Sequence, residues 1–376
     1  MGQACVTRRR MLQGSLTLGV ASAMGALWPV RPARAAKPMT VGFVYVGPRN
    51  DFGWNQSHWV AARKIAQLDG VKVIEQENVP ETIEVEKVME GMIRHDGAGV
   101  VFATSFGYWP HVLKLARRYP DVLFTHIGAL WKDGDPKNAV GYRGYMEEPH
   151  YLCGVAAGHV TRTKKIAFVG SKPLYFIFNN ANGFILGARS VDPAITCQVV
   201  ITGDWNNPVR EAEVTNSLVD QGVDVIVANV DSAKVMIENA ERRGIFSCGY
   251  HTDLSELAPK GFLTGAEWNW AAAAQFVQAW QTGGTYPNLL RGGFRQDMVG
   301  LSPFGRAVPQ DVRARIVKIK QGFADDSFKL YRGPLKDNEG NVVLREGQVI
   351  ANDDNAFKLG VNFLVEGAIG KTGLKK

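Results

Sequence analysis

The chain has 376 residues, of which 45% are hydrophobic and 21% charged, a composition that is typical of a folded globular protein and excludes a disordered one. This length exceeds what a single hydrophobic core usually serves, so we expect two domains. The formal net charge of +7 includes five arginines and no acid within residues 1–35, so the rest of the chain carries about +2 (7 − 5), too little for a nucleic-acid-binding surface.

Residues 1–35 have the order of an export signal. Arg8 and Arg9 precede an apolar stretch from Leu16 to Trp28, and Ala33-Arg34-Ala35 supplies the small residues of a cleavage point. The paired arginines indicate the twin-arginine class, which exports folded proteins. Because the apolar stretch is short and contains Gly and Ser, we expect removal of residues 1–35 and not a membrane anchor. The mature protein is then expected in the periplasm.

The next hundred residues alternate between short apolar runs and amphipathic segments. The strand-like runs are Val41–Val46, Val71–Glu75, Gly99–Ala103 and Val122–Ile127. One intervening segment places Val85, Val88, Met89, Met92 and Ile93 on a single face of a helix. This alternation predicts parallel βαβ units with helices on both faces of a sheet.

The loop after the first strand is the first candidate for a binding site. Gly47-Pro48 ends the strand, and a helix is expected from about Trp54. Ligands of open α/β sheets bind beyond the carboxyl ends of the strands, where this chain carries Asp51, Trp54 and Asn55. An equally open alternative is that Trp54 covers the core and the polar residues only cap the helix.

The pattern then repeats. Ile166–Gly170 resembles Val41–Val44, and 222–227 resembles 97–102, both at an offset of 125 residues (166 − 41 and 222 − 97). Ile245–Gly249 follows Val122–Ile127 at nearly the same offset. Three matches in register predict two lobes of similar architecture, with several short crossovers because no Pro- or Gly-rich linker separates them.

Beyond residue 265 the alternation weakens. The sequence there predicts an Ala-rich helix, a strand, a basic amphipathic helix and a hairpin with a polar turn, at Trp268–Trp280, Met298–Leu301, Pro309–Gln321 and Leu335–Leu344.

Three cysteines follow the export signal, an odd number for an oxidising compartment. Cys153, Cys197 and Cys248 each stand beside apolar or small residues, so we expect them to be buried and unpaired. A bridge between Cys197 and Cys248 is the minor alternative.

No motif in the chain indicates catalysis or a cofactor. A dinucleotide-binding Gly-x-Gly-x-x-Gly, a phosphate loop and a Gly-x-Ser-x-Gly elbow are absent from the sequence, and its histidines do not pair at metal-ligand spacing. We therefore expect neither an enzyme nor a bound cofactor or metal, although residues distant in sequence can meet in a fold.

Several segments together resemble the basic membrane protein (BMP) family of substrate-binding proteins for ABC importers, which includes purine nucleoside receptors. They are the first strand with its Asp51…Trp54-Asn55-Gln56-Ser57 loop, the segment 147–158, Lys165–Gly170, Gly203-Asp204-Trp205, and Gly333-Pro334…Asp337…Gly340 with 363–367. The resemblance implies an α/β, type I periplasmic-binding-protein fold: two Rossmann-like lobes, three crossovers and a ligand cleft. Lobe I is expected at 36–146 and 265–303, and lobe II at 147–264 and 304–376.

The resemblance also implies a binding site in which one aromatic side chain from each lobe encloses a purine. Trp54, with Asn55 beside it, occupies the aromatic position of the first lobe, and Trp205 occupies that of the second lobe. Asp51 fits a polar ligand contact. Asp253 occupies the position that holds a ribose hydroxyl in nucleoside receptors. A lysine expected near a late helix is replaced by Trp268, preceded by Glu267, which favours a base over a nucleoside. Ser105 and Phe106, at the end of a third strand, are further candidates, although Ser105 fits a structural turn equally well.

The sequence therefore predicts a periplasmic solute receptor for a purine nucleobase such as adenine, or a nucleoside. The expected partners are the solute and the permease and ATPase subunits of an ABC importer, with no nucleic acid, and the mature protein is expected to be soluble and monomeric. A sugar or amino-acid receptor is the second choice of ligand class. An extracytoplasmic enzyme or a sensor domain on the same scaffold is a less favoured function.

Overall fold

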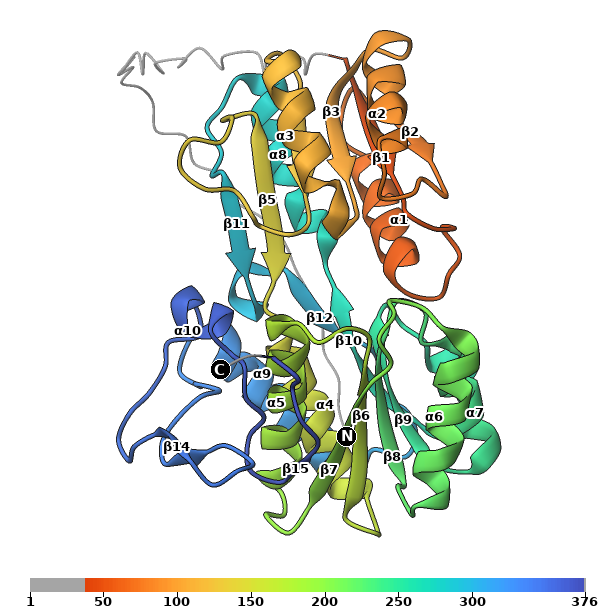
Figure 1. The fold of residues 1–376 in the computed structure, drawn as a ribbon, viewed down its shortest axis with the longest axis vertical. Helices are drawn as coiled ribbons and strands as arrows, with labels where there is room; N and C mark the ends of the chain where they lie inside the picture. The colour runs from red at the N-terminus through yellow and green to blue at the C-terminus, as the bar shows by residue number, and fades with distance from the viewer. Residues whose placement is uncertain (1–37, 375–376) are drawn as a thin grey trace, which may run out of the picture. The chain divides into compact units, whose positions relative to one another are not determined.

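The computed structural model describes residues 38–374, so the expected export signal lies outside the described residues. Within 38–374 the chain forms two α/β lobes, each a mainly parallel sheet with helices on both faces (Figure 1). The predicted fold class is confirmed. No helix of this part of the chain is long and apolar enough to cross a membrane.

The sheet of the first lobe has the order β11-β5-β4-β3-β1-β2, and all its neighbouring strands are parallel. Its strands are β1 (Met39–Val44), β2 (Val71–Gln76), β3 (Ala98–Ala103), β4 (Leu123–His126), β5 (Ala139–Gly144) and β11 (Leu289–Gly292). The helices of this lobe are α1 (Trp54–Ile65), α2 (Glu84–Arg94), η1 (Phe106–Tyr108), α3 (Trp109–Arg118), η3 (Trp270–Ala273) and α8 (Ala274–Thr282).

The sheet of the second lobe has the order β12-β10-β9-β8-β6-β7-β15, parallel except for β10 with β12. Its strands are β6 (Lys165–Gly170), β7 (Thr196–Ile201), β8 (Val225–Asn229), β9 (Phe246–His251), β10 (Phe262–Trp268), β12 (Val299–Leu301) and β15 (Ala368–Ile369). The accompanying helices are α4 (Glu147–Val160), α5 (Tyr175–Arg189), α6 (Pro208–Asp220), α7 (Lys234–Arg243), η2 (Ser255–Leu257), η4 (Phe294–Gln296), α9 (Gln310–Ala324) and α10 (Asn355–Leu359). A small hairpin of β13 (Leu335–Lys336) and β14 (Val342–Leu344) lies near the C-terminus.

The two lobes repeat one topology. Across the two sheets, the neighbouring strands β2-β1-β3-β4-β5 and β7-β6-β8-β9-β10 follow the same doubly wound order, 2-1-3-4-5 when each set is numbered along the chain. Strands β6, β8 and β9 are the segments that the 125-residue offset pairs with β1, β3 and β4, so the predicted duplication is confirmed.

Three crossovers join the lobes within the described residues, after β5, after β10 and between β11 and β12. They pack tightly at Gly144. A Cβ on this glycine would lie 2.7 Å from Val299 Cγ1 and 2.8 Å from Trp268 Cζ3, so only glycine lets the three crossovers meet. Beside them, Lys358 of α10 forms a buried ion pair with Glu147 at the start of α4, with Nζ and Oε1 2.5 Å apart.

One prediction about the region after residue 265 was wrong in detail. The helix expected from Trp268 begins only with η3, because β10 remains paired with β9 as far as Glu267 and His251. The segment 265–303 is expected in lobe I, and its strands, the end of β10 and β12, pair with one another at the edge of the second sheet. How the chain divides into bodies that move stays a prediction.

The cysteine prediction is confirmed for Cys153, Cys197 and Cys248, which are buried and free. Burial raises the pKa of the Cys197 thiol, so it is unreactive at neutral pH.

Candidate ligand-binding site

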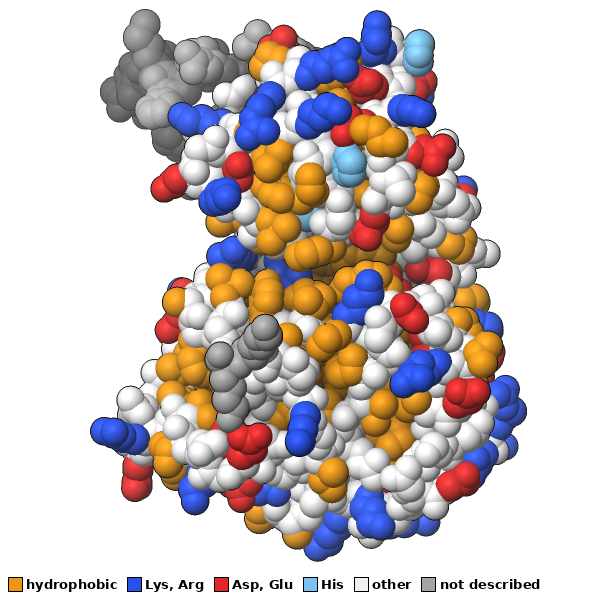
Figure 2. Space-filling model, in the orientation of Figure 1, with side chains coloured by type: hydrophobic (Ala, Val, Ile, Leu, Met, Phe, Trp, Pro, Cys, Tyr) orange, Lys and Arg blue, Asp and Glu red, His pale blue; other side chains and the backbone are white. Residues whose placement is uncertain are grey.

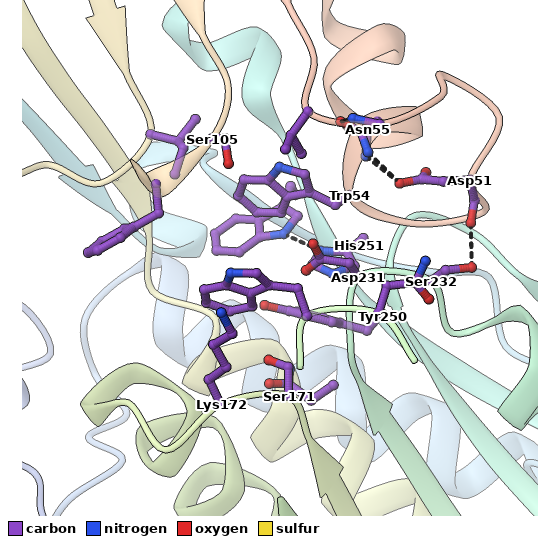
Figure 3. Close-up of a pocket in the computed structure, with 18 of the residues that line it drawn as sticks. Asp51, Trp54, Asn55, Ser105, Ser171, Lys172, Asp231, Ser232, Tyr250 and His251 are labelled. Atoms are coloured by element: carbon purple, nitrogen blue, oxygen red, sulfur yellow. Dashed lines mark hydrogen bonds between the residues drawn. The ribbon is translucent and has the colours of Figure 1, made fainter. Parts of the chain in front are cut away.

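A cavity of about 510 Å³ lies between the lobes, at the carboxyl ends of both sheets, and the surface is hollowed there (Figure 2). This volume is within the range of small-molecule sites. The cavity lies where the topology predicts it, because parallel strands of both lobes end at its walls (Figure 3).

Asp51 shapes the first wall by capping α1. Its carboxylate accepts hydrogen bonds from the backbone N–H groups of Gly53, Asn55 and Gln56 and from the Asn55 side chain, at 2.8–3.0 Å. Burial raises the pKa of Asp51, although these four hydrogen bonds oppose the shift. Asp51 lines the cavity, but its acceptor capacity is largely used by the cap.

The same cap orients Asn55. Its Nδ2 donates to Asp51, and its Oδ1 accepts from the Gly47 N–H at 3.2 Å. One N–H of the amide is left for a ligand. Asn55 lines the cavity, and its contact with a ligand stays a prediction.

Trp54 contributes an aromatic surface with no free donor. Its Nε1–H donates to the Thr104 carbonyl at 2.8 Å, and its ring stands edge-to-face against His251, Trp268 and Trp270 at centroid distances of 5.4–6.1 Å. The indole is therefore held by the fold and meets a ligand through its apolar surface.

Trp205 lies on the wall formed by the second lobe. Its ring is nearly parallel to Phe176, with centroids 6.4 Å apart and planes at 7°, and Lys172 Nζ lies 4.8 Å from its centroid. No ring contact joins Trp54 to Trp205 in residues 38–374, although both line the cavity. The expected enclosure of a ligand between them stays a prediction.

Ser105 and Phe106 both line the cavity beside α1. The Ser105 hydroxyl donates to Glu81, and Glu81 also accepts the Gly107 N–H at 2.7 Å. Ser105 therefore keeps its hydroxyl oxygen available as an acceptor. Phe106 approaches Phe176 of the other lobe, with centroids 6.4 Å apart.

Two of the expected site residues, Asp253 and Glu267, do not line this cavity. Asp253 is exposed and accepts the Ser255 N–H at 2.9 Å, because it caps the short helix η2. Glu267 accepts the Ser302 hydroxyl and lines a separate cavity behind the crossovers. Neighbouring residues of a strand point to opposite faces, so Trp268 can line the ligand cavity while Glu267 points away from it.

His251 fixes the position of Trp268. The Trp268 Nε1–H donates to Nδ1 of His251 at 2.8 Å, so Nε2 carries the ring proton and donates to the Val230 carbonyl at 3.1 Å. Burial holds the pKa of His251 well below its ordinary value. A neutral, single-tautomer imidazole therefore joins the second crossover to the loop after β8.

The sequence analysis missed several groups on the cavity wall. They are Glu81, Arg143, Lys172, Phe176, Asn229, Asp231, Tyr250, His251 and Trp270. Lys172 and Asp231 stand just after the ends of β6 and β8, so a search of every predicted strand end could have found them. Arg143 stands near the end of β5, a strand that the sequence analysis did not predict.

The loops before α1 and α7 touch across the cleft. The Trp54 N–H donates to the Asp231 carbonyl at 2.9 Å, and the Ser232 hydroxyl donates to the Asp51 carbonyl at 2.7 Å. A Cβ on Gly53 would lie 1.8 Å from the Asp231 carbonyl oxygen, so the approach requires glycine. We name these contacts of residues 51–54 with 231–232 the interlobe latch.

Two lobes of one topology, three crossovers and a walled cavity between strand ends define the class of two-lobed solute-binding proteins. Within residues 38–374, no group of three or more His, Cys, Asp or Glu is placed to hold a metal ion.

Comparison with known proteins gives the family. Residues 39–323 match the Bmp family, described as ABC transporter substrate-binding protein PnrA-like, and the chain belongs to that family. It is 31% identical over 347 residues to a purine-binding protein of Brucella abortus, covering 90% of this chain and 95% of that one. A putative ABC transporter glucose-binding protein of Haloferax volcanii is 27% identical, covering 81% and 77%.

A solved structure supports the fold. The solute-binding protein of an ABC transporter system from Conexibacter woesei has a TM-score of 0.66 at 20% identity, covering 78% of this chain and 98% of that one. By its family, the protein is a substrate-binding protein of an ABC transporter, and a small-molecule ligand and membrane partners follow from that class.

Proposed function

We propose that the protein delivers a purine to an ABC importer and that it binds the base between aromatic groups of its two lobes. The observation that carries the proposal is a cavity with indole side chains on walls from both lobes, Trp54 on one and Trp205 on the other. The similarity to a purine-binding protein supports it. Adenine is the reference ligand for testing it.

Energies show what else the site must supply. Stacking on an aromatic side chain contributes roughly 1–3 kcal/mol per base, whereas micromolar affinity needs about 8 kcal/mol. Hydrogen bonds to the edge of the base in a closed cleft must supply the remainder. Asn55 and Ser105 each keep one group free for this purpose.

We propose a base in preference to a nucleoside. Trp268 occupies the wall where the family resemblance places a lysine. Asp253, the group expected to hold a ribose hydroxyl, is exposed and does not line the cavity, which supports this preference. Each hydroxyl buried without a partner would cost about 1–3 kcal/mol.

Isothermal titration of the mature protein against adenine, adenosine, glucose, ribose and a set of amino acids tests the proposal. We expect adenine to bind more tightly than adenosine, and no response to the other compounds. Adenosine binding as tightly as adenine would refute the preference for the base. Binding of glucose alone would move the protein to the sugar receptors, the second candidate, which the similarity to a putative glucose-binding protein favours.

A further inference from the structure

Three ionisable side chains on the cavity wall form no hydrogen bond or ion pair with the described residues. Arg143, Lys172 and Asp231 line the cavity and are partly buried. The two cations lie over aromatic rings, Arg143 over Phe176 and Lys172 over Trp205. A ligand in the cavity can supply the polar partners that these rings do not.

The three groups surround one stacking surface. Lys172 Nζ lies over the Trp205 ring, and the Asp231 N–H donates to the Trp205 carbonyl at 2.8 Å. Arg143 Cζ lies 3.9 Å from the centroid of Phe176, whose ring is nearly parallel to Trp205. In Figure 3, Lys172 extends from the β6 end of the cavity toward its aromatic groups, and Asp231 lies on the same side as Ser232. A flat ligand in this part of the cavity therefore lies beside two cations and one carboxyl group.

The charge of the whole wall decides between an anion and a neutral ligand. Among the described residues that line the cavity, the carboxyl groups are Asp51, Glu81, Asp204 and Asp231, against the two cations Arg143 and Lys172. Burial raises the pKa of Asp231, and the other three carboxyl groups still outnumber the cations. A phosphate would meet more negative than positive charge. The ligand that suits this wall is neutral and has strong acceptor atoms.

We propose that the preferred ligand is a 6-oxopurine, with Arg143 and Lys172 donating to its O6 and N7 edge and Asp231 accepting a ring N–H. This inference rests on the proposed purine-binding function and places adenine second. Arginine or lysine on O6 and N7 is the usual way in which proteins recognise guanine, whereas adenine presents an amino donor at the same position. Arginine and lysine side chains only donate hydrogen bonds, so they would leave the amino group of adenine without an acceptor.

Hypoxanthine and adenine differ at position 6 and share the same ring system, so they form the matched ligand pair. Titration of the mature protein with each, followed by calorimetry or tryptophan fluorescence, should give a dissociation constant at least tenfold lower for hypoxanthine. Adenine binding as tightly as hypoxanthine, or more tightly, would overturn this inference and leave the purine-receptor proposal standing. Binding of neither purine would remove both.

Variants assign the preference to residues. Arg143→Gln and Lys172→Gln should each lower the hypoxanthine-to-adenine preference severalfold, because they weaken hypoxanthine binding more than adenine binding. Arg295→Gln is the control, because Arg295 is exposed, pairs with Asp326 and lies outside the cavity wall. Two independent positions keep the test valid if one variant folds poorly, which its melting temperature reveals. An unchanged preference in both folded variants would refute the roles given to Arg143 and Lys172.

Discussion

Trp54 and Trp205 differ in how much of the fold depends on them. Trp54 donates to the Thr104 carbonyl and contacts four other rings, whereas Trp205 is stacked mainly on Phe176 and covered by Lys172. Both line the cavity, so we expect either substitution to affect ligand binding. Stability and affinity measured together therefore separate their roles.

We expect Trp205→Ala to weaken purine binding by about 1–3 kcal/mol with little change in melting temperature, because mainly a stacking surface is lost. Trp54→Ala should weaken binding similarly and also lower the melting temperature, because removing a packed indole leaves a cavity among its neighbouring rings. Calorimetry and thermal unfolding measure the two effects. Trp59→Ala is the control, because Trp59 is a half-buried tryptophan of α1 outside the cavity wall. Unchanged affinity in Trp205→Ala would remove this residue from the site.

At the scale of elements, the loops that follow the strands both line the cavity and join the two lobes. The residues of the interlobe latch, Asp51, Gly53 and Trp54 with Asp231 and Ser232, lie on the same loops as groups of the cavity wall. A ligand that holds Trp54 and the Asp231 loop together therefore favours the latch, and the latch in turn encloses the ligand.

Gly53→Ala should block the latch, because the added methyl carbon would overlap the Asp231 carbonyl oxygen. We expect purine affinity to fall at least tenfold, although Gly53 offers no side chain to a ligand. Gly91→Ala is the matched control, since Gly91 lies in α2 with nothing within 4 Å of an added Cβ. Calorimetry on both variants tests this, and wild-type affinity in Gly53→Ala would show that closure does not need the contact.

Glu148 joins two crossovers and is a second test at this scale. It lies at the start of α4 and accepts the Phe294 N–H of the third crossover at 2.9 Å. Burial raises the pKa of Glu148 from 4.5 to about 8. A carboxyl with a raised pKa in the folded state contributes its full stability below pH 4.5 and loses it as pH rises through 8.

Glu148→Gln should therefore flatten the pH dependence of unfolding between pH 5 and 8. The loss in the wild-type protein over this window is on the order of 4 kcal/mol from this group, at 1.36 kcal/mol per pH unit. Urea unfolding at several pH values gives the free energy of unfolding of wild type and variant. In the difference between the two proteins, the contributions of the other titrating groups cancel. Glu256→Gln, at an exposed position of η2, should follow the wild type. Parallel curves for wild type and Glu148→Gln would contradict the assignment.

At the scale of the whole molecule, two lobes joined by three crossovers have to open for a ligand to enter. The cavity is walled by both lobes, and the latch connects them across the cleft. Entry of a solute into such a cavity requires a hinge motion.

We expect small-angle scattering to give a smaller radius of gyration with saturating ligand than without it. Gly53→Ala should show less of this change than Gly91→Ala, because only the former obstructs the latch. An identical radius with and without ligand in the wild type would indicate a rigid receptor.

Export belongs to the same scale, although residues 1–35 lie outside the described part of the chain. We propose the twin-arginine route because Arg8 and Arg9 precede the apolar stretch. Replacing both by Lys should leave the precursor in the cytoplasm, as cell fractionation would show. Undiminished periplasmic accumulation would contradict the route.

The sequence alone determined the class of fold and much of one wall of the cavity. Alternating apolar runs and the 125-residue offset predict two parallel sheets because strand and helix periodicity are local properties. Asp51, Trp54 and Asn55 were recognisable because they follow the first strand directly, and ligands bind beyond strand ends.

Only the tertiary structure decided which other residues meet at the cavity. Arg143, Lys172 and Asp231 belong to three separate strand ends, and no local pattern indicates that they share one ligand surface. Glu267 and Asp253, which the sequence places at the site, do not line the cavity for a related reason. The direction of a side chain depends on the pairing of β10 and on the cap of η2, which arise from contacts distant in the sequence.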